Sequence, residues 1–429
     1  MIFTRLSKAT SPSSALALAL VLAATGTAGV FALEQPALAQ KKKKDEAKPA
    51  AKNFSKEFVA VYQPVADTVN GEGADWAGAA AQIPTIKAAV QTDDDRMVAG
   101  NLIYSIGTNT QNRALQLEGA ELMLASGKVP AENQGQYNLL AGQLAYNEKQ
   151  YAKSRTYLLK AIELGYLESE PEGLVAESYF SEDNFAAGLK YLRDAIAAKE
   201  AAGQPVNEQW VRRGLQMAYN NKLPTELGEF SLLFAKHFPS SENWGEVIAI
   251  TAYGGGWKNP EILDLVRLAR SANAMRDERM YADYIDSADY RRLPGEVLAV
   301  IDEGYAAGTL SKTDSYVAEV RSMAADRAKA DRAELSGLLN SAKGSSDVKS
   351  VMSGGDLALG YGDYAAAEVL YAKALGMPGV ETGVARTRLG IAQLKQGKAS
   401  EAEATFNAVE GPRSTIARLW ATYAAQQGG

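Results

Sequence analysis

The chain has 429 residues, 46% of them hydrophobic, with no cysteine, one histidine and a formal net charge of −6. The lack of cysteine excludes disulfides, thiolate zinc sites and cysteine nucleophiles. The acidic balance argues against a nucleic-acid-binding protein, for which a basic face is expected. His237 stands alone, which argues against histidine-rich metal sites and most catalytic triads. We therefore expect no cofactor and no metal.

Residues 1–39 have the pattern of a secretory signal peptide. Arg5 and Lys8 precede an apolar run over residues 14–24, and residues 37–39 form a small-x-small cleavage site before Gln40. Residues 30–32 offer a second cleavage site. We expect an exported protein, with the bacterial periplasm as its compartment.

An uncleaved membrane anchor is the alternative interpretation of this segment. Thr25, Gly26, Thr27 and Gly29 interrupt its apolar run, which favours cleavage. Since no other stretch approaches membrane length, we expect no transmembrane span after cleavage.

A basic linker is predicted over residues 40–55. Its residues 40–52 hold six lysines and two acidic residues, a net charge of +4. The signal contributes +1, and subtracting both from −6 leaves −11 for the remaining body. The functional interpretation is a weak contact of this linker with an anionic surface; the alternative is a solvated tether.

The next segment, residues 56–130, is predicted to form N-terminal helical hairpins. A short amphipathic segment is expected over residues 54–66, and helices are expected over residues 76–90, 93–106 and 112–126, with a turn at residues 108–110. Pro84 is expected to split the second of these helices. The acidic run Asp93–Asp95 lacks the spacing of a calcium loop, so a role at a helix N-terminus is the simpler account.

Residues 131–203 contain a repeat of period 34. Tyr151, Leu158 and Ala161 are followed 34 positions later by Phe185, Leu192 and Ala195. Such a period is typical of stacked helical hairpins. We predict two hairpins here.

Residues 204–343 keep the hairpin rhythm but diverge in sequence. Trp210 and Trp244 are again 34 apart. Residues 311–339 are expected to form one long helix or two. Gly254–Gly256 is interpreted as a loop, because it lacks the spacing of a phosphate-binding loop and follows no strand.

Residues 344–429 return to a regular pair of hairpins followed by a capping helix. Gly362, Ala367 and Tyr371 are followed 35 positions later by Gly397, Ala402 and Phe406. Trp420 is expected to cover the end of the stack, because a terminal repeat otherwise exposes apolar surface.

Together these features resemble the tetratricopeptide repeat family. The match is carried by Gly362-Asp-Tyr364, Ala367 and Tyr371, and by Leu389-Gly390. Tyr151 and Ala161 match as well, as do Phe185 and Ala195 one repeat later. The resemblance implies an all-α fold, a right-handed superhelical solenoid of antiparallel helix hairpins. It also places Gly355 at a position where a small residue permits close helix packing.

In that family, protein or peptide partners bind in a concave groove lined by the first helix of each hairpin. Applied to this sequence, the resemblance implies six residues that line such a groove, and for each of them ordinary packing is the alternative. These groove candidates are Gln143, Tyr146, Glu177, Phe180, Leu215 and Tyr219.

Catalytic motifs are weak. Ser346-Asp-Val-Lys349 fits a Ser-x-x-Lys pattern, but the accompanying motifs do not follow, so Ser345 or Ser346 is expected to cap a helix. We therefore predict no catalytic residues and a binding scaffold for proteins of the cell envelope. The alternatives are a carboxylate-based hydrolase acting on envelope glycan and a small-ligand carrier.

Overall fold

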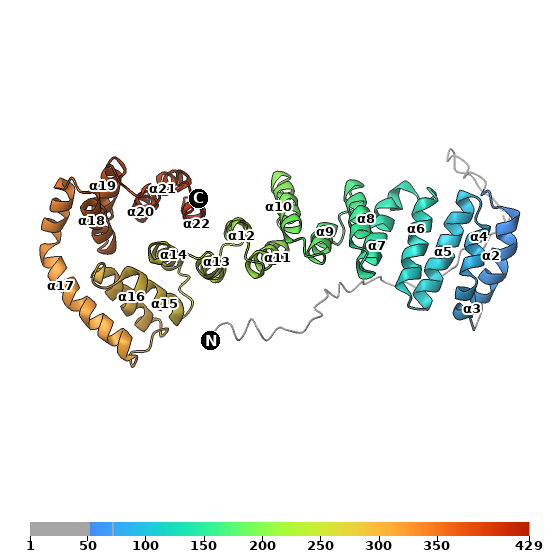
Figure 1. Cartoon of the computed structure of the whole chain (residues 1–429), viewed down its shortest axis with the longest axis horizontal. Helices are drawn as coiled ribbons and strands as arrows, with labels where there is room; N and C mark the ends of the chain where they lie inside the picture. Colours follow the sequence, from blue (N-terminus) through green and yellow to red (C-terminus); the bar gives the residue numbers. More distant parts are fainter. Residues whose placement is uncertain (1–51, 71–72, 429) are drawn as a thin grey trace, which may run out of the picture. The chain divides into compact units, whose positions relative to one another are not determined.

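The computed structural model describes residues 52–70 and 73–428, and these form helices joined by turns (Figure 1). The expected signal peptide and residues 40–51 of the basic linker lie outside these ranges. Within them, no helix combines the length and the apolar character needed to cross a bilayer. The chain divides between Pro171 and Glu172 into two compact units, so the boundary falls inside the expected pair of hairpins at 131–203.

Unit 1 contains these helices: α2 (Lys56–Val69), α3 (Trp76–Ala81), α4 (Ile83–Ala89), α5 (Asp93–Asn109), α6 (Arg113–Ala125), the 3-10 helix η1 (Ala131–Asn133), α7 (Gln134–Asn147) and α8 (Tyr151–Glu163). The split near Pro84 is confirmed, since α3 and α4 are separate helices. The turn expected at residues 108–110 begins only at Thr110, so its predicted start is wrong. Helix α5 continues through Asn109 because the Asn109 amide and the Thr110 hydroxyl donate to backbone carbonyls one turn earlier, at 2.8 and 2.7 Å.

The acidic run at the start of α5 caps that helix, as predicted. Thr92 and Asp95 form a capping box, in which each side chain accepts from the other's backbone N–H. The buried Asp95 carboxylate also accepts from the Ser55 hydroxyl at 2.8 Å and from the Ser55 N–H at 3.1 Å. One carboxylate thereby caps α5 and fixes the start of α2.

Unit 2 contains these helices: α9 (Pro171–Phe180), α10 (Phe185–Ala201), α11 (Glu208–Asn220), α12 (Pro224–His237), α13 (Ser241–Gly254), α14 (Asn259–Ser271), α15 (Glu278–Ala288), α16 (Pro294–Ala306), α17 (Ser315–Gly344), α18 (Val348–Gly360), α19 (Tyr364–Leu375), α20 (Thr382–Lys395), α21 (Ala399–Asn407) and α22 (Ser414–Gln427). The segment expected as one or two helices near 311–339 is the single helix α17, which joins α16 to α18 (Figure 1). Asp347 caps α18 by accepting from the Ser350 N–H, so the expectation that Ser345 or Ser346 would do so is wrong.

A glycine packs against a large side chain at the same place in four hairpins. The pairs are separated by sixteen positions: Gly142 with Leu158, Gly214 with Phe230, Gly355 with Tyr371 and Gly390 with Phe406. A Cβ atom on Gly355 would lie 2.7 Å from the Tyr371 ring, closer than carbon atoms can approach. The predicted role of Gly355 in packing is confirmed, and the shared contact explains the recurring sequence pattern.

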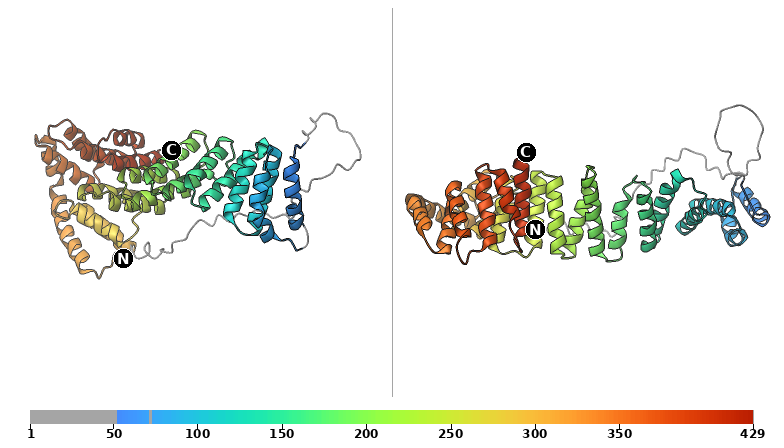
Figure 2. Two further views of the ribbon diagram at one scale, coloured as in Figure 1. Left: turned by 45° about the vertical axis from the view of Figure 1, so that its right-hand side comes forward. Right: turned by 90° about the horizontal axis from the view of Figure 1, so that it is seen from above.

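The C-terminal helices of unit 2 pack against its middle helices. Helix α22 contacts α12 and α14, helices that precede it by about 150 to 190 residues (Figure 2). Trp420 is fully buried in this contact, and its indole N–H donates to the Asp264 carbonyl at 2.9 Å. The expectation that Trp420 covers an open end of the stack is therefore wrong, because the end packs against an earlier part of the same unit.

Candidate functional site

Two of the six groove candidates are core residues and do not line a surface. Phe180 is 6% exposed and Leu215 is 2% exposed, and both belong to the main hydrophobic cluster of unit 2. The Phe180 ring fills the space left by the missing side chain of Gly188. A groove role for Phe180 and Leu215 is thus wrong, because neither offers side-chain surface to a partner.

The other four candidates are partly exposed, and a groove role for them stays a prediction. Gln143 and Tyr146 lie on α7, and the centroid of the Tyr146 ring is 5.5 Å from that of Tyr151 in an edge-to-face arrangement. Tyr219 on α11 packs at the margin of the unit 2 core. Glu177 on α9 accepts two hydrogen bonds from the Arg213 guanidinium, at 2.5 and 2.8 Å.

The pair of Glu177 and Arg213 belongs to a series of ion pairs between successive hairpins of unit 2. The other members include Arg193 with Glu229, Arg212 with Glu246, Lys236 with Glu200, and Arg270 with Glu303. Their partners are 33 to 36 residues apart, about one repeat. These ion pairs therefore hold neighbouring hairpins in register. Each pair contributes little stability on its own because it is part-exposed.

A buried network of charged side chains lies where α14, α16, α18, α20 and the start of α22 meet. Each member is at most 6% exposed: Asp264, Arg267, Glu296, Asp356, Arg388 and Arg413. Three carboxylates face three guanidinium groups, so the network is balanced in charge. Buried charges are tolerated only in such paired and hydrogen-bonded arrangements.

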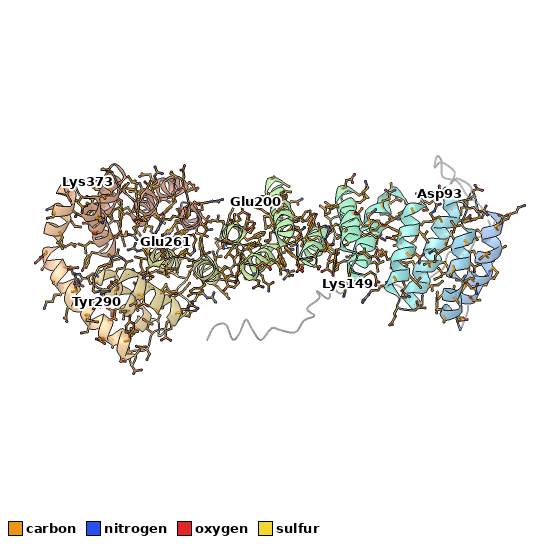
Figure 3. The ribbon with its side chains drawn as sticks, viewed as in Figure 1. Asp93, Lys149, Glu200, Glu261, Tyr290 and Lys373 are labelled. Carbon is orange, nitrogen blue, oxygen red and sulfur yellow. The ribbon has the colours of Figure 1, made fainter. Side chains whose placement is uncertain are left out.

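Asp264 is the centre of this network. Its carboxylate accepts from Arg388 at 3.4 Å, from Arg267 at 3.3 Å and from Arg413. Arg413 also donates to Glu261, labelled in Figure 3, at 2.9 Å. Because Arg388 and Arg413 are 124 and 149 positions from Asp264, these bonds fasten the C-terminal helices to α14.

The two remaining carboxylates are each held by an arginine and a tyrosine. Asp356 accepts from Arg388 and from the Tyr371 hydroxyl, all at 2.7 Å. Glu296 accepts from Arg267 at 2.6 and 2.7 Å and from Tyr284 at 2.6 Å.

These partners keep the network charged despite its burial. Burial alone would raise the pKa of Glu296, but the charge and hydrogen bonds of Arg267 outweigh it and lower that pKa to about 2. Burial would likewise lower the pKa of Arg388, but Asp356 and Asp264 hold it above its usual range. Every carboxylate is occupied by protein donors, so the arrangement can hold helices together but leaves no group open to a substrate.

Sequence reasoning missed this network, although a signal for it was present. Asp264 and Arg267 lie three apart within Leu263–Ala269, seven consecutive buried residues of an otherwise apolar stretch. Arg388 lies in a similar buried run in α20. Charged residues inside such runs predict burial with partners, but not which partners.

Among the described residues, no cluster of His, Asp and Glu side chains is arranged to hold a metal ion. His237, at the end of α12, lies 2.6 Å from a Glu200 carboxylate oxygen, which also accepts from Lys236. The lone histidine is thus part of an ion-pair cluster between α10 and α12.

A groove of about 560 Å3 opens in unit 2 between α10 and α12 on one side and α21 and α22 on the other. Its apolar lining consists of Leu232, Leu233, Ala421 and Ala425, and its polar lining includes Glu403, Asn407 and Arg418. None of the six groove candidates lies in it. It forms only because the C-terminal helices pack against α12.

No family model matches the chain, and neither does any curated protein. Among solved structures, the chain is similar to that of Naa15/Naa10 bound to HypK-THB, with 13% identity and a TM-score of 0.36. The match covers 79% of this chain and 62% of that one, so the chain spans less than two thirds of that chain's length. A TM-score this low does not establish a shared fold, and the description of this chain as an all-α helical repeat protein rests on its own helices.

Proposed function

We propose that the protein is an exported scaffold that binds protein or peptide partners of the cell envelope, in the bacterial periplasm, and has no catalytic activity of its own. The observation that carries the proposal is the stack of hairpins itself, which presents extended, part-exposed helix faces. Such surfaces suit the recognition of other polypeptides.

The carboxylates of the buried network lend no support to the hydrolase alternative. A glycan hydrolase needs two carboxyl groups beside the bond that breaks. Asp264, Glu296 and Asp356 are each at most 6% exposed and bonded to arginine, so none can reach a glycan. A small-ligand carrier needs an enclosed cavity, whereas the groove beside α22 is lined partly by exposed side chains such as Lys236 and Arg418.

The proposal is tested by crosslinking the full chain in an exporting bacterial host, followed by mass spectrometry. We expect a processed N-terminus at Gln40, or at Leu33 if the alternative site is used, and reproducible crosslinks to envelope proteins. A protein that stays in the cytoplasm, or one that yields no partner even when overproduced, would contradict the proposal.

A further inference from the structure

The groove between α12 and α22 combines an apolar floor with charges of two kinds on its walls. The charges on the α10–α12 wall are already paired. Arg193 bonds to Glu229, while Glu200, labelled in Figure 3, accepts from Lys236 at 2.7 Å. Because these charges neutralise one another at contact distance, this wall offers little net attraction to a charged partner.

The α21–α22 wall differs. Arg418 is exposed and Glu403 is part-exposed, and neither has an ion-pair partner among the residues that the structure describes. Asn407, also exposed, adds an amide at the end of α21. Counting partners only within the described part of the chain, the groove therefore carries one unpaired cation and one unpaired anion beside its apolar residues.

The floor is shaped for apolar side chains. Leu232 and Leu233 on α12 are part-exposed, and α22 contributes Ala421 and Ala425, one helical turn apart. The polar residues Thr422 and Gln426 lie beside these alanines. The space between α12 and α22 is an open cleft of about 560 Å3, a volume that a few side chains of a bound segment could fill.

We propose that this groove binds a short segment of a protein partner that carries apolar side chains together with one acidic and one basic side chain. The acidic side chain pairs with Arg418 and the basic side chain pairs with Glu403. The inference rests on the proposed scaffold function and assigns it a site outside the six groove candidates. Charge complementarity argues for this occupant, because a uniformly acidic or basic segment would be repelled by one of the two unpaired groups.

The test uses three synthetic peptides, each with a central Leu-Ala-Leu in which one leucine is photoreactive. One has glutamate before and lysine after this core, one has lysine at both ends, and one has glutamate at both ends. We expect the full chain to prefer the first peptide, with photo-crosslinks on α12 and α22.

Charge reversal should change the order of preference. Arg418→Glu leaves two anions on the wall and should favour the peptide with two lysines. Glu403→Lys leaves two cations and should favour the peptide with two glutamates. We expect each change in relative affinity to be about three- to tenfold, as for exposed charge pairs whose sign is inverted.

Lys349→Glu is the matched control for Arg418→Glu, because it changes the net charge by the same amount and in the same direction on an exposed position of α18, outside the groove. It should keep the wild-type order. The same order of preference in every variant, or crosslinks that map outside the groove, would overturn the proposal. Unchanged circular dichroism and melting temperature would exclude misfolding as the cause of a shift.

A photoreactive residue introduced into the full chain in the envelope separates this inference from the proposed function. Leu233 lies in the groove, and Val369, 56% exposed on α19, lies away from it. Partners recovered by general crosslinking but never through Leu233 would refute the groove and leave the scaffold standing. If the peptides are preferred in the predicted order but no envelope partner is found by any route, the scaffold function is refuted while the binding site in the groove is supported.

Discussion

The repeated contact between a glycine and a large side chain predicts that one substitution, glycine to alanine, has opposite effects at two helical positions of unit 2. Gly355 lies in α18, where a Cβ would be 2.7 Å from the Tyr371 ring. Gly337 lies in α17, is exposed, and would have nothing within 4 Å of its Cβ. Gly337→Ala should stabilise unit 2, and Gly355→Ala should destabilise it.

The magnitudes follow from two terms. Alanine is favoured over glycine inside a helix by about 0.5–1 kcal/mol, and this gain is common to both positions. At Gly355 the extra carbon adds an overpacking cost of about 1–3 kcal/mol. The Tyr371 ring cannot recede freely, because it is fully buried and its hydroxyl donates to Asp356 at 2.7 Å. The difference between the two variants therefore isolates the packing cost.

Tryptophan fluorescence during thermal unfolding measures this difference. Four of the five tryptophans lie in unit 2, and Trp76→Phe removes the one in unit 1. In that background we expect the two melting temperatures to differ by roughly 2–12 °C, with Gly337→Ala the higher. Equal melting temperatures, or a stabilised Gly355→Ala, would refute the close approach of α18 and α19 at this point.

Three further predictions test the buried groups. Glu296→Gln should destabilise unit 2 by about 3–5 kcal/mol at pH 7, because it removes the main carboxylate partner of the buried Arg267 and leaves the network with one uncompensated positive charge. Since the pKa of Glu296 is lowered to about 2 from its ordinary value of 4.5, its contribution is present above pH 4.5 and is lost as the pH falls toward 2. Urea denaturation across this window should show a steeper loss of stability in the wild type than in the variant, and parallel curves would contradict the assignment. Phe180→Ala should cost about 3–5 kcal/mol as a core truncation, whereas a partner-binding defect at wild-type stability would restore its groove role. Asp95→Asn should destabilise unit 1 by about 1–2 kcal/mol, because the amide keeps one acceptor oxygen and turns its NH2 group toward donors that the carboxylate had satisfied. The change is measured by the fluorescence of Trp76, while Asp93→Asn, whose side chain is 59% exposed, should change stability by less than about 0.5 kcal/mol.

Much of the local architecture could be predicted because it depends on short spacings. The break at Pro84, the capping role of Asp93–Asp95 and the packing role of Gly355 each follow from one residue type within one or two helical turns or one hairpin. The failures at Thr110 and at Asp347 are also local. Thr110 extends α5 by bonding to the Ile106 carbonyl, and Asp347 takes the capping place expected of Ser345 or Ser346, a competition that residue type alone does not decide.

The candidate site was harder to predict, because facing a groove depends on rotation about a helix axis. Phe180 and Leu215 lie on helices that resemble groove-lining ones, but their side chains turn into the hydrophobic cluster. An aromatic residue or a leucine at such a position can pack into a hydrophobic core as readily as it can line a groove. The residue type was therefore compatible with both outcomes, and the packing of the neighbouring helix decided between them.

The sequence by itself determined that this chain is a stack of helical hairpins, because a period of 34 or 35 and a recurring small residue specify contacts between neighbours along the chain. Only the tertiary structure decided that α22 packs against α12 and α14, that Asp264 meets Arg388 and Arg413, and that a groove opens beside them. The physical reason is that a repeat fixes the small rotation from one hairpin to the next, whereas contacts across 124 to 191 residues depend on the accumulated curvature of every hairpin between them.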